Sequence, residues 1–130
     1  MAARRDADGE HRTAPVAVGR PVSADTAATL RTMLISTVDN GIANGATVPH
    51  FSVAGKTGTA QIPSDDGRYI DDAYISSFAG FAPANDPRFV VVIVLERPQS
   101  KLLGTVTAMS TFRNIAQDAL RSMRVQPDRP

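Results

Sequence analysis

The feature that most constrains the fold is a continuous apolar run from Phe89 to Leu95, rich in β-branched residues. Such a run predicts a β-strand, and since no polar residue alternates with the apolar ones, both of its faces need cover. That requirement favours a layered α+β arrangement, in which helices pack against a sheet. The run is the longest apolar stretch of the chain, and it falls far short of the roughly 20 residues that a membrane-spanning helix needs.

The remaining periodicities predict two further strands and two helices. Ser23 is a favourable N-cap for the first helix, and Asn40 and Gly41 are suited to end it. A Pro-rich loop joins the second and third strands as a hairpin. The predicted fold is therefore a partial antiparallel sheet of three strands with flanking helices. In chain order the predicted elements are a helix over 23–39, strands over 51–62, 74–82 and 88–96, and a helix over 105–123.

The two ends of the chain are predicted to lie outside this core. Residues 1–22 are polar and punctuated by Gly and Pro, which indicates a flexible lead or a strand fragment without its partner. Residues 125–130 are expected to form a disordered tail. Residues 23–124 are then the single folded segment.

Composition excludes several classes of function. Fourteen Lys and Arg residues oppose thirteen Asp and Glu, a net charge of +1, so no broad field favours binding to nucleic acid or to an anionic membrane. The absence of Cys excludes disulfides, thiolate metal sites and a cysteine nucleophile. His11, His50, Asp71 and Asp72 lack the spacing of metal ligands, so we expect no metal and no cofactor. No export signal or membrane anchor is expected within these residues.

The strongest candidate site is Lys56-Thr57-Gly58-Thr59, within the first predicted strand. Side chains alternate across a sheet, so Lys56 and Thr57 leave on opposite faces, and a site that uses both must lie beyond a free strand edge. Gly58 removes a side chain that would obstruct that edge. An ammonium, a hydroxyl and unpaired backbone groups suit a peptide-like acyl substrate. The alternative is a solvated edge Lys followed by turn-like glycines.

The wider context of this motif resembles a known family. Lys-Thr-Gly-Thr-Ala-Gln, an interposed loop, Tyr-Ile-Ser-Ser-Phe-Ala-Gly-Phe-Ala-Pro and Asp-Pro-Arg-Phe-Val-Val-Val precede a terminal helix. This order resembles the end of the transpeptidase domain of class B penicillin-binding proteins, especially the septal cell-division type. The resemblance runs from about Val22 to Met123, and its specific parts are Val53 to Gln61, Tyr74 to Pro83 and Asp86 to Val94. It implies a fragment of the serine β-lactamase and D,D-transpeptidase fold.

The resemblance also implies roles for individual residues. Lys56 would line the catalytic cleft, and the backbone N–H of Thr59 would donate to the oxyanion. Thr57 and Gly58 would contact the substrate, and Thr57 would bind the carboxylate of a β-lactam or a stem peptide. Gln61 would bind the substrate farther along the same edge. The implied reaction is cross-linking of peptidoglycan by acyl transfer from D-Ala-D-Ala stem peptides, on the extracytoplasmic face of the cytoplasmic membrane.

Two family motifs have no match among these 130 residues. The only lysines, Lys56 and Lys101, follow Val53 and Pro98 by three residues, so there is no Ser-x-x-Lys, and no Ser-x-Asn occurs either. We therefore expect a truncated part of a transpeptidase that is inactive alone. The alternative is a non-catalytic strand-pairing module or an inert fragment. In the family sheet the last strand also pairs with strands from the start of the domain, so we expect an open edge and possible self-association.

Two other kinds of site match these residues less well. Gly55-Lys56-Thr57 matches the end of a phosphate-binding loop, but His50 stands where its first glycine should be, and the motif sits on a strand. Ser76 and Ser77 are predicted to be sheet residues, one facing each side, because no His is placed to activate them.

Overall fold

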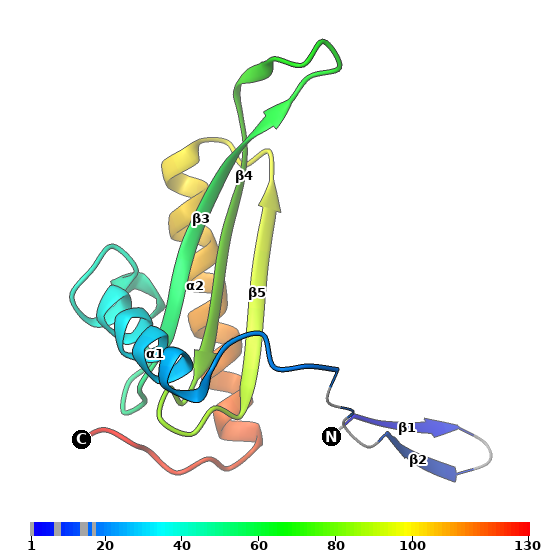
Figure 1. Ribbon diagram of the computed structural model, residues 1–130, viewed down its shortest axis with the longest axis vertical. Coiled ribbons are helices and arrows are strands. Elements are labelled where there is room, and N and C mark those ends of the chain that lie inside the picture. The colour runs from blue at the N-terminus through cyan, green and yellow to red at the C-terminus, as the bar shows by residue number, and fades with distance from the viewer. Residues whose placement is uncertain (1, 7–8, 14–15, 17) are drawn as a thin grey trace.

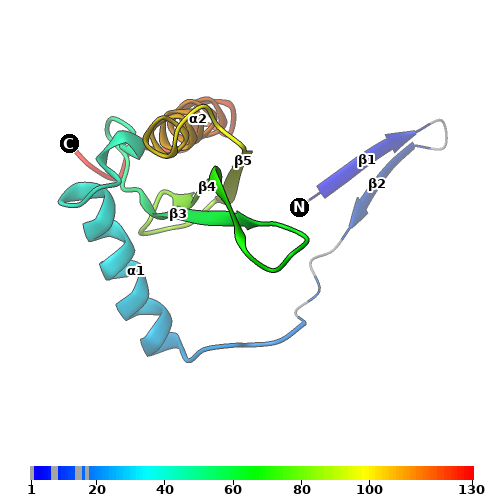
Figure 2. The same ribbon diagram turned by 90° about the horizontal axis from the view of Figure 1, so that it is seen from above.

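The computed structural model describes residues 2–6, 9–13, 16 and 18–130 (Figure 1). A three-stranded antiparallel sheet in the order β3-β4-β5 forms its centre, with α2 over one face and α1 beside the start of β3 (Figure 2). This confirms the predicted α+β class and the partial sheet with flanking helices. The elements are β1 (Ala2–Asp6), β2 (Gly9–Thr13), α1 (Ala24–Asp39), a 3₁₀ turn (Asn44–Ala46), β3 (Ala54–Pro63), β4 (Tyr69–Ala82), β5 (Phe89–Glu96) and α2 (Lys101–Ser122).

The lead, predicted to be flexible or a strand fragment without its partner, contains two strands that pair with each other as a hairpin. Strands β1 and β2 pair with each other in antiparallel register, from Ala2 opposite Thr13 to Asp6 opposite Gly9. They form a sheet of their own and do not extend β3-β4-β5. Two strands this close in sequence can satisfy each other's backbone hydrogen-bonding groups, since antiparallel pairing needs only a short connection. The rest of the lead that was predicted to be flexible includes residues 1, 7–8, 14–15 and 17, which lie outside the described residues.

Helix α1 begins and ends where its capping residues predict. The Ser23 side chain accepts a hydrogen bond from the Thr26 N–H at 3.1 Å, which satisfies one of the unpaired donors of the first turn. Asp25 lies in that turn, where its charge complements the helix dipole. Asn40 closes the helix by donating its backbone N–H to the Ser36 carbonyl at 2.9 Å.

Helix α2 starts four residues before the predicted position. Ser100 is its N-cap and accepts from the Leu103 N–H at 3.2 Å. The prediction began at residue 105 because Gly104 weakens the helical signal of the first turn. In the structure Gly104 is a point of close approach, since a Cβ there would lie 2.5 Å from both Ser76 Oγ and Pro98 Cγ. The helix therefore rests directly on the sheet at this glycine.

The core lies between α2 and the sheet. Phe112 of α2 and Phe78 of β4 are fully buried, and their rings meet edge to face with centroids 4.8 Å apart. Ala108, Ala116 and Leu120 continue the buried stripe of α2. This aromatic pair sets the packing distance between α2 and β4.

The expectation that both faces of the last strand are covered is wrong for the described residues. Along β5, Val91, Ile93 and Leu95 pack on the core, whereas Val90, Val92 and Val94 are 69%, 60% and 60% exposed. The exposed valines lie on the face of the sheet opposite α2. An unbroken apolar run predicts a strand, but it does not show whether both faces of that strand are buried.

Strand β4 also begins earlier than predicted, at Tyr69, so the connection to β3 is shorter than a loop from Pro63 to Asp72. Asp71 and Asp72 conceal this start, since Asp is depleted in strands, and Asp72 has a φ of 55°. The β3–β4 register shifts between Gln61 and Pro63, which marks where the regular ladder ends.

The last six residues, predicted to be disordered, make defined contacts. The Asp128 carboxylate accepts hydrogen bonds from the Ser52 N–H at 2.6 Å, from the Ser52 hydroxyl and from Asn85 Nδ2 at 3.0 Å. Arg129 donates two hydrogen bonds of 2.8 Å to the carboxylate of Asp39, at the end of α1. We call these contacts of Asp128 and Arg129 the C-terminal latch.

These contacts shift the pKa values of Asp128 and Arg129. Partial burial disfavours the ionised form of Asp128, but the hydrogen bonds from Ser52 and Asn85 and the charge of Arg129 outweigh it and hold the pKa of Asp128 below its ordinary value. The hydrogen bonds to Asp39 raise the pKa of Arg129 above its ordinary value. The folded chain thus favours the charged form of both residues.

Candidate functional site

Strand β3 is an edge strand, and its backbone orientation can be derived from one contact. The Thr37 hydroxyl of α1 donates to the Gly55 carbonyl, so this carbonyl points away from β4. In a β-strand the N–H and C=O of one residue point to the same side, and every second residue repeats that direction. The backbone groups of Gly55, Thr57 and Thr59 therefore all point outward from the sheet.

Lys56 and Thr57 lie on opposite faces of the sheet, as strand alternation requires. Lys56 stands opposite Ala79, which in turn faces Val92, and these three form a row on the open face. Thr57 stands opposite the buried Phe78, on the face covered by α2, and is itself half-buried.

The two side chains nevertheless converge at the free edge. Lys56 Nζ donates to the Thr57 carbonyl at 3.1 Å and lies 3.4 Å from Thr57 Oγ1. The ammonium thus folds round the strand from the open face to the hydroxyl on the other side. This brings a cation, a hydroxyl and outward backbone groups to one point, where a carboxylate or a carbonyl oxygen would find complementary donors.

Gly58 is required by its neighbour across the ladder. A Cβ at Gly58 would lie 2.5 Å from Ser77 Oγ, so a larger residue would push the strand or the serine aside. The glycine thus keeps the ladder flat beside Lys56, which lies on the same face.

Thr59 and Gln61 continue the same edge, and both are exposed. Thr59 stands opposite Ser76 and Gln61 opposite Tyr74, so both share a face with Thr57. The structure thus brings all five predicted site residues, Lys56 to Thr59 and Gln61, onto one edge of β3. Among the described residues no carboxylate forms an ion pair with Lys56, so its ammonium faces solvent.

The alternative sites find no support in the geometry of the described residues. Gly55-Lys56-Thr57 lies inside β3, and the chain continues into β4, not into the helix that a phosphate-binding loop opens. Ser76 is buried under Gly104 with no partner for its hydroxyl, and Ser77 faces the other side. Over 2–6, 9–13, 16 and 18–130 no three His, Cys, Asp or Glu residues are grouped to hold a metal ion.

Sequence reasoning missed two residues that shape the edge. Thr37 anchors the Gly55 carbonyl from 18 positions earlier in the chain, and Ser77 limits residue 58 from the neighbouring strand. Neither residue carries a local signal, because both act through contacts that only the folded chain creates.

Comparison with known proteins places this edge in a family. Residues 2–117 match the family described as "Penicillin binding protein transpeptidase domain". The chain is 37% identical to Stage V sporulation protein D of Bacillus subtilis over 117 residues, which are 89% of this chain and 18% of that protein. It is 42% identical to the peptidoglycan D,D-transpeptidase FtsI of Escherichia coli over 84 residues, 64% of this chain and 14% of FtsI.

Solved structures agree with the sequence relatives. Penicillin-binding protein 3 of Mycobacterium tuberculosis, in complex with ampicillin, superposes with a TM-score of 0.79 and 34% identity, covering 98% of this chain and 30% of that one. The D,D-transpeptidase domain from Eggerthella lenta gives a TM-score of 0.74 at 32% identity, covering 92% of this chain and 26% of that one. This chain therefore spans less than a third of the length of these relatives.

The described helices include none with the length and apolarity to cross a bilayer. The matched residues include the whole of β3, β4 and β5 and most of α2, so the Lys-Thr-Gly edge lies inside the shared region. The chain belongs to the penicillin-binding protein transpeptidase family.

Proposed function

We propose that this chain supplies the Lys-Thr-Gly wall of a peptidoglycan D,D-transpeptidase site. The observation that carries the proposal is the convergence at the β3 edge, where Lys56 Nζ lies 3.4 Å from Thr57 Oγ1 beside outward backbone groups. Family membership supports the reaction class, since relatives include a peptidoglycan D,D-transpeptidase and a structure complexed with ampicillin. The substrates are then stem peptides, and β-lactams act as their mimics.

Each residue of the edge has a proposed role. Lys56 is catalytic through its ammonium, which sets the charge and the proton state around an attacking hydroxyl. Thr59 is catalytic through its backbone N–H, which opposes the negative oxygen of the tetrahedral intermediate. Thr57 binds the carboxylate of the substrate, Gly58 leaves the edge accessible, and Gln61 extends the binding strip.

The reaction is a double acyl transfer. A serine oxygen forms an ester with the carbonyl carbon of the penultimate D-Ala while the bond to the terminal D-Ala breaks, and that D-Ala leaves with the proton. The amine of a neighbouring stem peptide then attacks the ester, which forms the cross-link and frees the serine. These 130 residues contain no Ser-x-x-Lys or Ser-x-Asn, so the proposal places the nucleophile outside them, and the chain alone is inactive. The site then works on the extracytoplasmic face of the cytoplasmic membrane.

A fluorescent penicillin tests the proposal in the complete protein that carries these residues. We expect stable covalent labelling that Lys56→Ala abolishes, while the matched variant Lys101→Ala, at the only other lysine of the 130 residues, labels like the unchanged protein. Thr57→Val keeps the shape of the side chain but removes its hydroxyl, and it should weaken β-lactam binding while leaving the fold intact. Normal labelling of the Lys56→Ala variant would exclude a catalytic Lys56.

A second role, strand pairing, is favoured by one observation. The outer edge of β5 has no partner among the described residues, and Val90, Val92 and Val94 are exposed beside it. We propose that the isolated 130-residue chain self-associates through this edge. Light scattering should find oligomers that Val92→Lys disperses, and a monodisperse, cooperatively melting monomer would refute self-association.

A further inference from the structure

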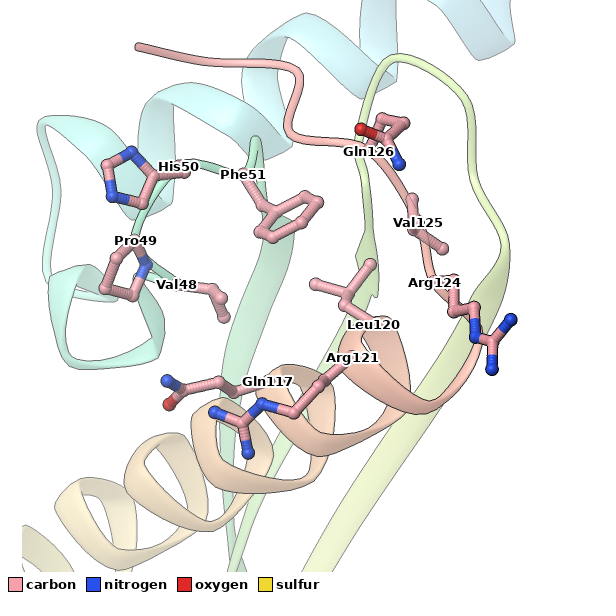
Figure 3. A pocket seen from close by; sticks show the side chains of 10 residues that line it. All are labelled: Val48, Pro49, His50, Phe51, Gln117, Leu120, Arg121, Arg124, Val125 and Gln126. Carbon is pink, nitrogen blue, oxygen red and sulfur yellow. The ribbon is translucent and has the colours of Figure 1, made fainter.

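A pocket of about 310 Å³ lies between the loop that precedes β3 and the C-terminal end of α2 (Figure 3). Its floor is apolar: Phe51 and Leu120 point toward each other, with Val48 and Val125 beside them (Figure 3). Its rim is basic, since Arg121 and Arg124 stand there. We call this the basic pocket. It contains none of the residues of the β3 edge, so it is separate from the proposed acyl-transfer site.

The walls of the basic pocket are held by backbone hydrogen bonds. At the end of α2, the Val125 N–H donates to the Leu120 carbonyl at 3.0 Å and the Arg124 N–H donates to the Arg121 carbonyl at 3.1 Å. This is a Schellman motif, and it satisfies the carbonyls of Leu120 and Arg121 in the last turn of the helix. On the opposite wall, a Val48–Phe51 bridge closes the loop. The pocket is thus preformed.

The C-terminal tail is tied to the loop that forms one wall of the same pocket. The backbone N–H groups of Asp128 and Arg129 both donate to the His50 carbonyl at 3.2 Å. The tail therefore runs across the loop and keeps Val125 in the wall. Preformed walls reduce the ordering cost of binding, which favours a recognition site over an accidental gap.

The rim carries positive charge that its neighbours do not neutralise. Arg121 reaches only Asp118, at 3.4 Å, and both side chains are largely exposed, so that pair is weak. Within the described part of the chain Arg124 forms no ion pair. A ligand with carboxylates would therefore meet two available guanidinium groups.

Two residues of the pocket adopt backbone conformations that favour glycine. Arg124 has a φ of 52° at the Schellman position, and His50 on the facing wall has a φ of 65°. A non-glycine residue there costs about 1–2 kcal/mol. The positive φ at Arg124 directs the chain from the end of α2 back along the pocket.

We propose that the basic pocket binds an acidic peptide segment of a partner protein. One apolar side chain of the peptide enters between Phe51 and Leu120, and carboxylates on either side of it pair with Arg121 and Arg124. An apolar anchor flanked by acidic residues matches the apolar floor and the basic rim in both shape and charge.

Fluorescence anisotropy on the complete protein tests this with a labelled peptide, Glu-Glu-Phe-Asp-Leu-Glu-Glu. We expect saturable binding that weakens with salt, is lost when the acidic residues become Gln and Asn, and is lost when Phe and Leu become Ser. Arg121→Gln and Arg124→Gly should each weaken binding about threefold, and the double variant about tenfold.

The chain offers a matched control at Arg97. This residue is an exposed arginine with a φ of 51°, located between β5 and α2 and outside the pocket. Arg97→Gly removes the same charge and relieves the same backbone conformation as Arg124→Gly. We expect Arg97→Gly to leave peptide binding unchanged. Both variants should keep the penicillin labelling of the unchanged protein and should melt at no lower a temperature, because glycine relieves the positive φ.

Four results would overturn the proposal. They are equal binding of the Gln and Asn peptide, equal weakening by Arg97→Gly, displacement of the peptide by penicillin, and absence of saturable binding. A different outcome would assign the surface to a membrane instead. The peptide would fail to bind, while the protein would sediment with anionic phosphatidylglycerol vesicles and the double arginine variant would not.

Discussion

Removing the carboxylate of Asp128 should destabilise the domain through a single buried residue. Ser52 is fully buried, and Asp128 accepts from both its N–H and its hydroxyl. The hydroxyl also accepts the N–H groups of Ala84 at 2.8 Å and Asn85 at 3.3 Å, and it keeps both in Asp128→Ala. The Ser52 N–H and the hydroxyl proton, however, lose their acceptor. An unpaired buried donor costs about 1–3 kcal/mol, and each hydrogen bond to a charged group contributes about 1.5–3 kcal/mol.

Because Asp128 is exposed, these free-energy costs are smaller at this site: water can accept some of the hydrogen bonds that the carboxylate accepts. We therefore expect Asp128→Ala to lower the free energy of unfolding by about 2–3 kcal/mol and Asp128→Asn by about 1 kcal/mol. The measurement is urea denaturation of the complete protein, followed by far-ultraviolet circular dichroism. The matched control is Asp86→Ala, whose exposed carboxylate lies 4.0 Å from Arg88 and should change stability by less than about 0.5 kcal/mol.

The same carboxylate makes stability depend on pH. Since folding lowers the pKa of Asp128 below 3.8, its contribution is present above that value and is lost as the pH falls through the lower folded pKa. The difference between the unchanged protein and Asp128→Asn should be constant above pH 5 and shrink below pH 4. A double-mutant cycle with Ser52→Ala tests whether the side chains of Asp128 and Ser52 stabilise the fold through their direct contact. Additive losses, to within about 0.5 kcal/mol, would refute a direct coupling of the two side chains.

Three more substitutions test the packing described above. Gly104→Ala should cost about 1–3 kcal/mol, measured as a lower melting temperature, because its Cβ would lie 2.5 Å from Ser76 Oγ and Pro98 Cγ; an unchanged melting temperature would contradict the close approach of α2. Phe112→Ala should cost about 3–5 kcal/mol in urea denaturation, since its fully buried ring packs on Phe78. Thr37→Val should cost about 1 kcal/mol and speed amide exchange along β3, because it removes the hydroxyl that holds the Gly55 carbonyl; unchanged exchange would show that α1 does not anchor the edge.

The elements that sequence reasoning located well are those with local signals. Ser23 and Asn40 bound α1 because capping depends on residues within one turn. The alternation of β3 also predicted correctly that Lys56 and Thr57 leave on opposite faces. The start of α2 was predicted four residues late, since Ser100 was not recognised as its N-cap. Local chemistry therefore determines where elements begin more reliably than it determines how they pack.

The features that sequence reasoning missed depend on contacts between distant residues. Asp128 and Ser52 are 76 positions apart. A short polar tail is predicted to be disordered because the sequence does not show that the Asp128 carboxylate accepts a hydrogen bond from the buried Ser52 N–H. The apolar run of β5 likewise suggested cover on both faces, whereas Val90, Val92 and Val94 are exposed among the described residues. The basic pocket likewise arises where a loop, a helix end and the tail meet, and none of the three carries a motif.

The contact between Thr37 and Gly55 also sets the length of the accessible strand edge. Because the Gly55 carbonyl is already occupied, the outward backbone groups that a ligand can reach begin at Thr57 and, at about 3.4 Å per residue, extend some 14 Å to Gln61, where the regular ladder ends. A tripeptide-sized molecule can align along that strip. Helix α1 thus sets where the accessible edge of β3 begins.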